Sequence, residues 1–382
     1  TLKVDDSKTQ RSATGTVAVS SKLIDGFTEI TAPANCYVAA PGALVKFPAN
    51  IGNTTEKAAF QTADLLWQDV AGMVEQLIVA PEENCVYAVL KSGVSGNAVV
   101  AVKNADGAVV WSYHLWVADF DPDANVMTWT DSESGTSYKM MDRYVGAVSN
   151  QPGSDLSNGL FYQWGRKDPF VNADGTESSV YVAKYDIDGN RVREVSEERP
   201  TYPSSDYEST NLQLAIQNPT IFYTAPSSSY PVQDWLTDDA QRQDHDLWGG
   251  VSGYKTKYDP CPEGWKVPVA GAPWGFRSEY RKTGGLQDDG AYDATAPWYC
   301  DYVNDNGFRY KQADSGKEYW FPFTGKKDVV TGVLNGVGSG ANYHTATRQN
   351  TLAIMELFAW GNPASETGLN RPYGSSVRCI KE

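Results

Sequence analysis

The sequence predicts a β-rich protein of two domains, an all-β sandwich over residues 1–125 and a second domain over residues 126–382. In the first domain, short strand-like runs are separated by turn residues about every ten positions, a spacing typical of sandwiches. An acidic stretch over residues 119–135 then favours exposed chain between domains. The length of 382 residues suffices for two or three separate cores.

The strand-like runs of the first domain cover residues 16–24, 28–31, 36–38, 44–47, 77–80 and 86–90. A hairpin is predicted between residues 98–103 and 108–117, because Asp106 and Gly107 in the connection favour the left-handed turn conformation. Residues 56–67 are ambiguous, and we leave their secondary structure undecided.

The acidic stretch contains Asp119, Asp121 and Asp123 with the spacing of a calcium-binding loop. Ala124 occupies the sixth position, where the sharp turn of such a loop needs Gly, and Thr130 occupies the twelfth, where a bidentate Glu is expected. We therefore interpret the stretch as a solvated linker and place the domain boundary there. Limited proteolysis would then release a folded piece that starts near Ser137.

The second domain begins with apolar segments and contains few helix signals. Residues 185–192, YDIDGNRV, predict an Asp-Gly hairpin that is exposed to solvent. Residues 232–247 are compatible with a short helix, whereas Pro273 and Gly275 weaken any helix in residues 271–281.

A rigid turn is predicted at residues 259–268, DPCPEGWKVP, because three prolines exclude a helix interior or a central strand. Residues 376–381 alternate as a terminal strand should. A Cys261–Cys379 disulfide would fix both segments and stabilise the fold by about 4–5 kcal/mol; the alternative is that both are buried free thiols. Cys36 and Cys85 form a second possible pair, and five cysteines leave at least one unpaired.

Composition limits the partners of the chain. A net charge of −15 and a pI near 4.7 argue against nucleic acid and anionic membranes as ligands, since both attract basic surfaces. No apolar run reaches the roughly 18 residues that a membrane span needs. Thr1 opens on polar sequence, so we expect that any signal peptide has been removed.

The sequence contains no assembled catalytic or cofactor motif. GxSxG, HExxH and CxxC are absent, and we predict no metal and no cofactor. Gly336, Gly338 and Ala341 partly match a dinucleotide fingerprint, but strand-like residues follow where the motif needs a helix.

Aromatic residues are concentrated between residues 298 and 323. An exposed aromatic ring in a polar region can stack on the face of a sugar, although most tryptophans belong to cores. The candidate ligand-binding residues are Trp298, Tyr299, Tyr343 and His344.

Seven segments of the second domain resemble a known family in sequence and in their order along the chain. They are MMDRYVGAVS, GLFYQWGRKDPF, IQNPTIFY, DLWG before YDPCPEGWKVP, WFPFTGKKD, GVLNGVGSGANYHTAT and RPYGSSVRCIKE. Together they resemble the Fibrobacter succinogenes major paralogous domain of fimbrillin-like surface proteins of Bacteroidetes. ANCYVAAPGALVKFP near the N-terminus resembles the sandwich-like module that often precedes it. The segment GAPWGF and the histidine in NYHTAT depart from the family pattern.

The resemblance implies an α+β second domain similar to C-type lectin and sulfatase-modifying-factor folds. It also implies an exported, outer-membrane-associated protein at the cell surface or in a fimbrium, a non-catalytic adhesin that binds glycan or protein ligands. Fimbrial subunits of this kind assemble by strand donation. Because the strand near Cys379 is assigned to the domain's own core, we expect the chain to accept a strand in its first domain but not to donate one from its C-terminus, as at a pilus tip.

Two other classes of function are compatible with the sequence. One is a soluble or lipid-anchored carbohydrate-binding protein. The other is a glycan-active enzyme or a relative of the formylglycine-generating oxidases, whose chemistry needs a reactive thiol pair. Cys300 near Cys261 or Cys379 is the only candidate for such a pair.

Overall fold

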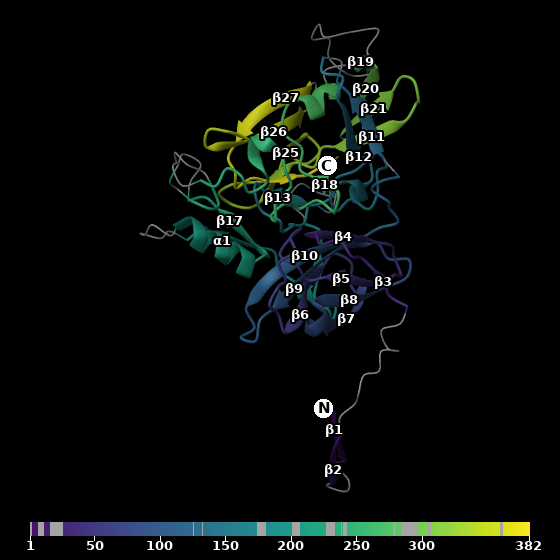
Figure 1. Cartoon of the computed structure of the whole chain (residues 1–382). Helices are drawn as coiled ribbons and strands as arrows, with labels where there is room; N and C mark the ends of the chain where they lie inside the picture. Colours follow the sequence, from purple (N-terminus) through teal and green to yellow (C-terminus); the bar gives the residue numbers. More distant parts are fainter. Residues whose placement is uncertain are drawn as a thin grey trace.

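The computed structural model describes residues 2–6, 11–15, 26–124, 126–131, 133–173, 181–200, 207–226, 234–237, 239, 243–277, 280–283, 297–303, 307–359 and 362–382. The chain is predominantly β, with several sheets (Figure 1). One α-helix occurs in these residues, α1 (Tyr207–Gln217), and the sequence reasoning missed it. Single-turn 3-10 helices are η2 (Pro81–Glu83), η3 (Asp155–Ser157) and η4 (Gly250–Ser252), and η5 (Ala272–Arg277) is longer.

The first domain consists of two facing groups of strands, consistent with the predicted sandwich. One sheet has the order β3 (Thr28–Glu29), β5 (Leu44–Pro48), β8 (Cys85–Leu90), β7 (Val74–Ala80). The other has the order β6 (Thr62–Gln68), β9 (Gly96–Lys103), β10 (Val109–Val117), β4 (Cys36–Ala39). Alternate residues such as Val45 and Phe47, facing Val100 and Val102, are buried in one apolar cluster between them, as the two-residue period of strands requires.

Two local predictions in this domain are confirmed, and one undecided segment is resolved. The β9–β10 hairpin is present, and its turn is held by Asn104 Oδ1, which accepts from the backbone nitrogens of Asp106 and Ala108. Gly107 adopts φ +80°, a conformation that favours glycine. The ambiguous segment becomes strand from Thr62 onward. The strand expected at residues 16–24 lies outside the described residues, and the segment before it forms the pair β1 (Leu2–Asp6) and β2 (Arg11–Gly15).

The predicted hairpin at residues 185–192 is present as β14 (Lys184–Tyr185) and β15 (Arg191–Val192). Its turn is exposed as predicted, but β14 also pairs with β6 through Tyr185 and Gln68. The second half of the chain therefore extends a sheet of the first. The nearby pair β16 (Val195–Glu198) and β17 (Ile221–Thr224) is parallel.

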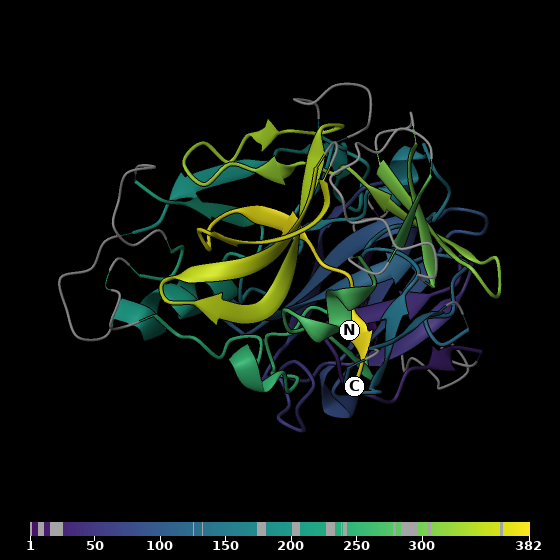
Figure 2. The same ribbon diagram turned by 90° about the horizontal axis from the view of Figure 1, so that it is seen from above.

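The second domain contains three further sheets, which Figure 2 shows from above with the long curved C-terminal strands in yellow-green and yellow. The first has the order β11 (Val126–Thr130), β12 (Ser137–Met141), β29 (Ile380–Lys381), β18 (Trp265–Lys266). The second has the order β24 (Leu334–Asn335), β23 (Lys326–Lys327), β28 (Gly374–Ser376), β25 (Gly340–Gln349), β26 (Leu352–Ala359), β27 (Asn362–Leu369), with β13 (Phe161–Gln163) paired to β28. The third has the order β19 (Tyr280–Thr283), β20 (Trp298–Val303), β21 (Gly307–Gln312), β22 (Glu318–Pro322).

Interpreting the whole acidic stretch as a solvated linker was wrong for residues 126–130. β11 pairs with β12 over five residues, and Met127 and Trp129 are buried in the core. The error has a physical reason, because the apolar residues of this strand alternate with polar ones that point to solvent, so average composition hides the buried face. The short helix considered at residues 232–247 is also absent from the part of that segment that the structure describes.

The two predicted domains share a core. One apolar cluster contains Val99 and Trp116 from the first part and Trp164, Trp248 and the disulfide cysteines from the second. Asn35 Nδ2 donates to the carbonyl oxygens of Lys257 and Asp259 at 2.7 and 2.8 Å. The boundary near residue 125 stays a prediction, but the two parts are joined by a common apolar cluster and by direct hydrogen bonds.

Candidate functional site

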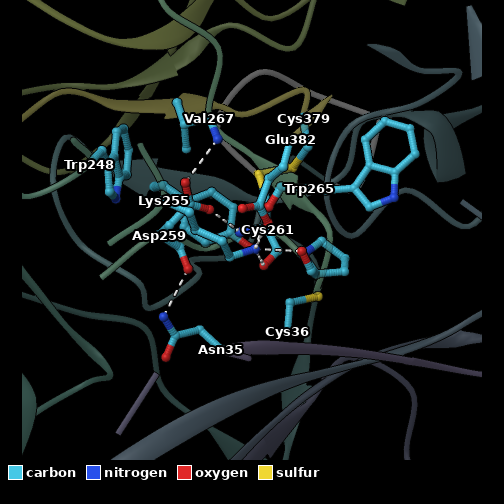
Figure 3. The surroundings of a disulfide bond; sticks show 12 residues. Asn35, Cys36, Trp248, Lys255, Asp259, Cys261, Trp265, Val267, Cys379 and Glu382 are labelled. Carbon is cyan, nitrogen blue, oxygen red and sulfur yellow. Dashed lines mark hydrogen bonds and ion pairs between the residues drawn. A yellow bond between two sulfur atoms is a disulfide. The ribbon is translucent and has the colours of Figure 1, made fainter. Parts of the chain in front are cut away.

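The predicted disulfide between Cys261 and Cys379 is present, with Cα atoms 6.0 Å apart (Figure 3). Lys255 Nζ donates to the carbonyl oxygens of Cys261 and Pro262 at 3.0 and 2.6 Å, and to that of Trp265. The turn is thus closed by a covalent bond and by a buried ammonium group that satisfies several backbone acceptors, which is a structural rather than a reactive arrangement.

Asp259 holds the same turn from the opposite side. Its carboxylate accepts from the backbone nitrogens of Cys261 at 2.8 Å and Val267 at 2.9 Å. Burial raises the pKa of the Asp259 carboxyl and lowers the pKa of the Lys255 ammonium, while the attraction between the two groups opposes both shifts. The pair therefore supports the fold around the disulfide.

Two expectations about the other cysteines are wrong. Cys36 and Cys85 are both free thiols, and they belong to different apolar clusters. Cys300 lies on β20 in a third cluster, and Cys261 and Cys379 are bonded to each other. Because Cys261 and Cys379 are bonded to each other, neither of them can form with Cys300 the thiol pair that oxidase chemistry would need.

The structure places four polar groups in a row that the sequence reasoning missed. Cys36 on β4 lies opposite His114 on β10, with Sγ 3.3 Å from Nδ1. His114 Nε2 lies 2.9 Å from Asn97 Oδ1 on the neighbouring strand β9. Asn97 Nδ2 in turn donates to Asp69 Oδ2 at 2.8 Å. Sequence pattern gives no signal for this row, because it depends on bringing β4 and the turn after β6 to the β9–β10 hairpin, from which both are distant along the chain.

The row of Cys36, His114 and Asn97 resembles a nucleophile, base and orienting group, but its environment opposes catalysis. All three side chains are buried. Burial raises the pKa of the Cys36 thiol well above its usual range and lowers the pKa of His114 to about 3. A nucleophilic cysteine needs an accessible thiolate, so this row is a hydrogen-bonded core element.

Three of the four candidate ligand-binding residues are in the core. Trp298 is 2% exposed, and Tyr343 and His344 are fully buried. Tyr343 stacks on Tyr144, with ring centroids 4.8 Å apart, and His344 Nε2 donates to the carbonyl oxygen of Tyr162 at 2.8 Å. Their burial excludes them as exposed stacking residues, because Trp298 faces the interior and β25 is covered on both faces, so that the adjacent Tyr343 and His344 are both buried.

Tyr299 is the fourth candidate and is half-buried. It occupies the opposite face of β20 from Trp298 and Cys300, since neighbouring residues on a strand point to opposite sides. The four candidates therefore do not form one site.

Trp298 nevertheless contributes to a surface hollow of about 430 Å³, which we call the tryptophan hollow. Its lining residues are Thr128, Trp129, Thr130, Pro297, Trp298, Gln312, Ala313 and Asp314. The hollow lies where the end of β21 meets β11, and Gln312 Nε2 fixes this junction by donating to the carbonyl oxygen of Thr128 at 2.9 Å.

The exposed side chains around the tryptophan hollow are mostly polar, and its two tryptophans are almost fully buried. Thr128, Thr130 and Asp314 are exposed, whereas Trp129 is 4% exposed and donates its indole N–H to the carbonyl oxygen of Ala272. Hydroxyl, amide and carboxylate groups around an apolar floor are the composition of sites that bind polar small molecules. The volume falls within the range of about 300–1,000 Å³ that is usual for ligand pockets.

No group of three or more His, Cys, Asp and Glu side chains in the described part of the chain has a geometry suited to a metal ion. Within the same residues, no helix is both long and apolar enough to cross a membrane. No protein-family model and no curated protein sequence matches this chain.

Proposed function

We propose that this chain is a non-catalytic cell-surface adhesin of fimbrial type that binds glycans at the tryptophan hollow. The observation that carries the proposal is one hollow of about 430 Å³ in which threonine, glutamine and aspartate side chains surround Trp129 and Trp298, which are 4% and 2% exposed. Sugar C–H groups pack on aromatic carbon, and sugar hydroxyls need both donors and acceptors nearby. The order of segments that resembles the major paralogous domain supports the surface setting.

The disulfide supports the same setting, because disulfides persist in oxidising compartments outside the cytosol. A C-type lectin-like fold for residues 126–382 is part of this proposal. The predominantly β body, with its long irregular connections between short strands, is the coarser observation on which that assignment depends.

Assembly by strand addition is the second part of the proposal. β7 is at the end of its sheet, and β8 is its one neighbour among the strands described. Leu77, Ile78 and Val79 on β7 are half-buried, so an added strand would meet an apolar as well as a hydrogen-bonding edge. The strands β28 and β29 are paired inside the second domain, so neither of them is free for donation, and the proposal gives this chain an acceptor role at the pilus tip.

The glycan proposal is tested with a glycan array probed with the purified chain and two variants. Thr130→Arg fills the tryptophan hollow from an exposed position without touching the core. Thr62→Arg is the matched control, because Thr62 is also an exposed strand threonine but lies outside the hollow. We expect the wild type and T62R to bind the same glycans and T130R to lose at least tenfold in signal. Equal binding by T130R, or binding of no glycan by the wild type, would overturn the proposal.

The fimbrial assignment is tested separately by immunogold electron microscopy of the native cell surface. Label at fibre ends supports the tip, and label along whole shafts contradicts it. Label on the bare outer membrane without fibres would favour the lipid-anchored carbohydrate-binding protein.

A further inference from the structure

A second hollow, of about 190 Å³, lies between the two halves of the chain, and its lining does not overlap with the tryptophan hollow. Its walls come from the turn after β6, the start of β9, the segment around η3 and the start of the second domain. The apolar lining includes Val148, Leu160 and Val182. Leu156 and Val70 stand at the rim and are 62% and 39% exposed. We call this feature the Asp69 groove.

Asp69 supplies a carboxylate to the groove. Its Oδ1 accepts from the backbone nitrogen of Asn97 at 2.7 Å, and its Oδ2 accepts from Asn97 Nδ2 at 2.8 Å. The amide of Asn97 is itself fixed, because Nδ2 also donates to the carbonyl oxygen of Gly146 and Oδ1 lies 2.9 Å from His114 Nε2. The carboxylate is therefore held in one orientation by neutral donors.

Charge in the groove is negative. Asp69 and, on η3, Asp155 are its titratable lining residues, and His114 behind Asn97 stays neutral because burial lowers its pKa to about 3. Among the described residues, no Lys, Arg or His side chain forms an ion pair with Asp69. A partly buried carboxylate with only amide partners is complementary to a cation.

We propose that the Asp69 groove binds one lysine or arginine side chain of a protein partner. The volume of about 190 Å³ is below the range of about 300–1,000 Å³ that is usual for organic ligands and suits a single long side chain. Such a side chain places its methylene groups against Leu156 and Val148 and its charged head at Asp69. The net charge of −15 favours encounter with a basic partner.

This inference is independent of the glycan proposal, because it concerns another site and another class of ligand. It also predicts pH dependence. Burial raises the pKa of the empty Asp69 to about 6, against the opposing effect of the Asn97 hydrogen bonds. A cation binds the ionised form, so affinity is full at pH 7.5 and falls about tenfold at pH 5, where the protonated carboxyl predominates.

The test uses the full chain and small probes that present one side chain, N-acetyl-lysine methylamide and N-acetyl-arginine methylamide, with N-acetyl-norleucine methylamide as the neutral analogue. Ligand-detected NMR measures their affinities. We expect millimolar dissociation constants for the cationic probes at pH 7.5 and at least tenfold weaker binding of the norleucine probe. Equal binding of all three probes would overturn the proposal, as would the absence of binding.

Two exposed substitutions locate the site. Leu156→Lys places a tethered ammonium group at the rim, where it occupies the groove and should weaken probe binding at least tenfold. Val251→Lys is the matched control, because Val251 is 72% exposed and does not line the groove, and it should leave binding unchanged. Asp69→Asn should weaken binding of the cationic probes at least tenfold at pH 7.5 and abolish its pH dependence. Unchanged affinity in L156K, or displacement of the probes by calcium alone at micromolar concentration, would contradict a side-chain site.

Discussion

Removal of the Cys261–Cys379 disulfide should substantially lower the free energy of unfolding of this chain. The bond joins residues 118 apart in sequence, and the chain-entropy model gives a stabilisation of about 5 kcal/mol at 25 °C for a loop of this length. Both cysteines are fully buried, so alanine at the two positions also removes packed sulfur atoms, and the comparison of oxidised with reduced wild type isolates the effect of the bond. In a urea titration this loss corresponds to a midpoint lowered by roughly 1–2 M.

The assay compares wild type, C261A/C379A and the control C36A, each with and without reductant. Wild type and C36A should both lose stability when reduced, because both contain the bond, whereas the double variant should not respond. Peptide mapping by mass spectrometry verifies that reductant has cleaved the bond. If the oxidised and fully reduced wild type unfold at the same urea concentration, the disulfide does not restrict the unfolded chain as argued.

Three further predictions concern the interior. Cys36 and Cys85 should resist thiol reagents at pH 8 until the protein unfolds, since burial raises both thiol pKa values, that of Cys85 to about 11; fast labelling of the native protein would contradict this. Burial lowers the pKa of His344 to about 4, below its value near 6.5 in the unfolded chain. Between these pH values the unfolded state binds one more proton than the folded state. The free energy of unfolding therefore falls as pH falls, by about 1.4 kcal/mol per pH unit. His344→Asn should flatten the measured slope by that amount, and an unchanged slope would refute the assignment. Gly52→Ala should lower the free energy of unfolding, measured by urea titration, by about 1–3 kcal/mol more than Gly72→Ala. Both glycines have positive φ, but only a side chain at position 52 would strike the backbone of Lys257. Equal losses in the two variants would show that the backbone at Lys257 moves aside.

Local features were predictable from the sequence where the residues that determine them lie within one short segment. The β9–β10 hairpin depends on Asp106 and Gly107 in its turn, and the rigid turn around Cys261 depends on its prolines. The partner of Cys261 was also predicted, because a bridge to Cys379 is the simplest way to fix both the proline-rich turn and the terminal strand. Each of these inferences needs only the chemistry of a few neighbouring residues.

The sequence did not show in the same way which aromatic residues are buried. Tyr343 stands in a polar sequence next to a glycine-rich loop, which suggested an exposed site. In the structure its ring packs between Tyr144 and Trp274, at centroid distances of 4.8 and 6.1 Å. Tyr144 lies about 200 positions and Trp274 about 70 positions before Tyr343 in the sequence. Burial on β25 is therefore decided by tertiary packing and not by the local pattern.

The same limit explains why the contact between the two predicted domains could not be read from composition. β4 pairs in parallel with β10, and Asn35, just before β4, hydrogen-bonds to Lys257 and Asp259 in the turn that contains Cys261. Asp259 holds the backbone nitrogen of Cys261, and Cys261 is covalently joined to Cys379. The disulfide therefore reinforces the turn on which the first sheet rests, and its loss should loosen the contact between the two halves as well as the second domain.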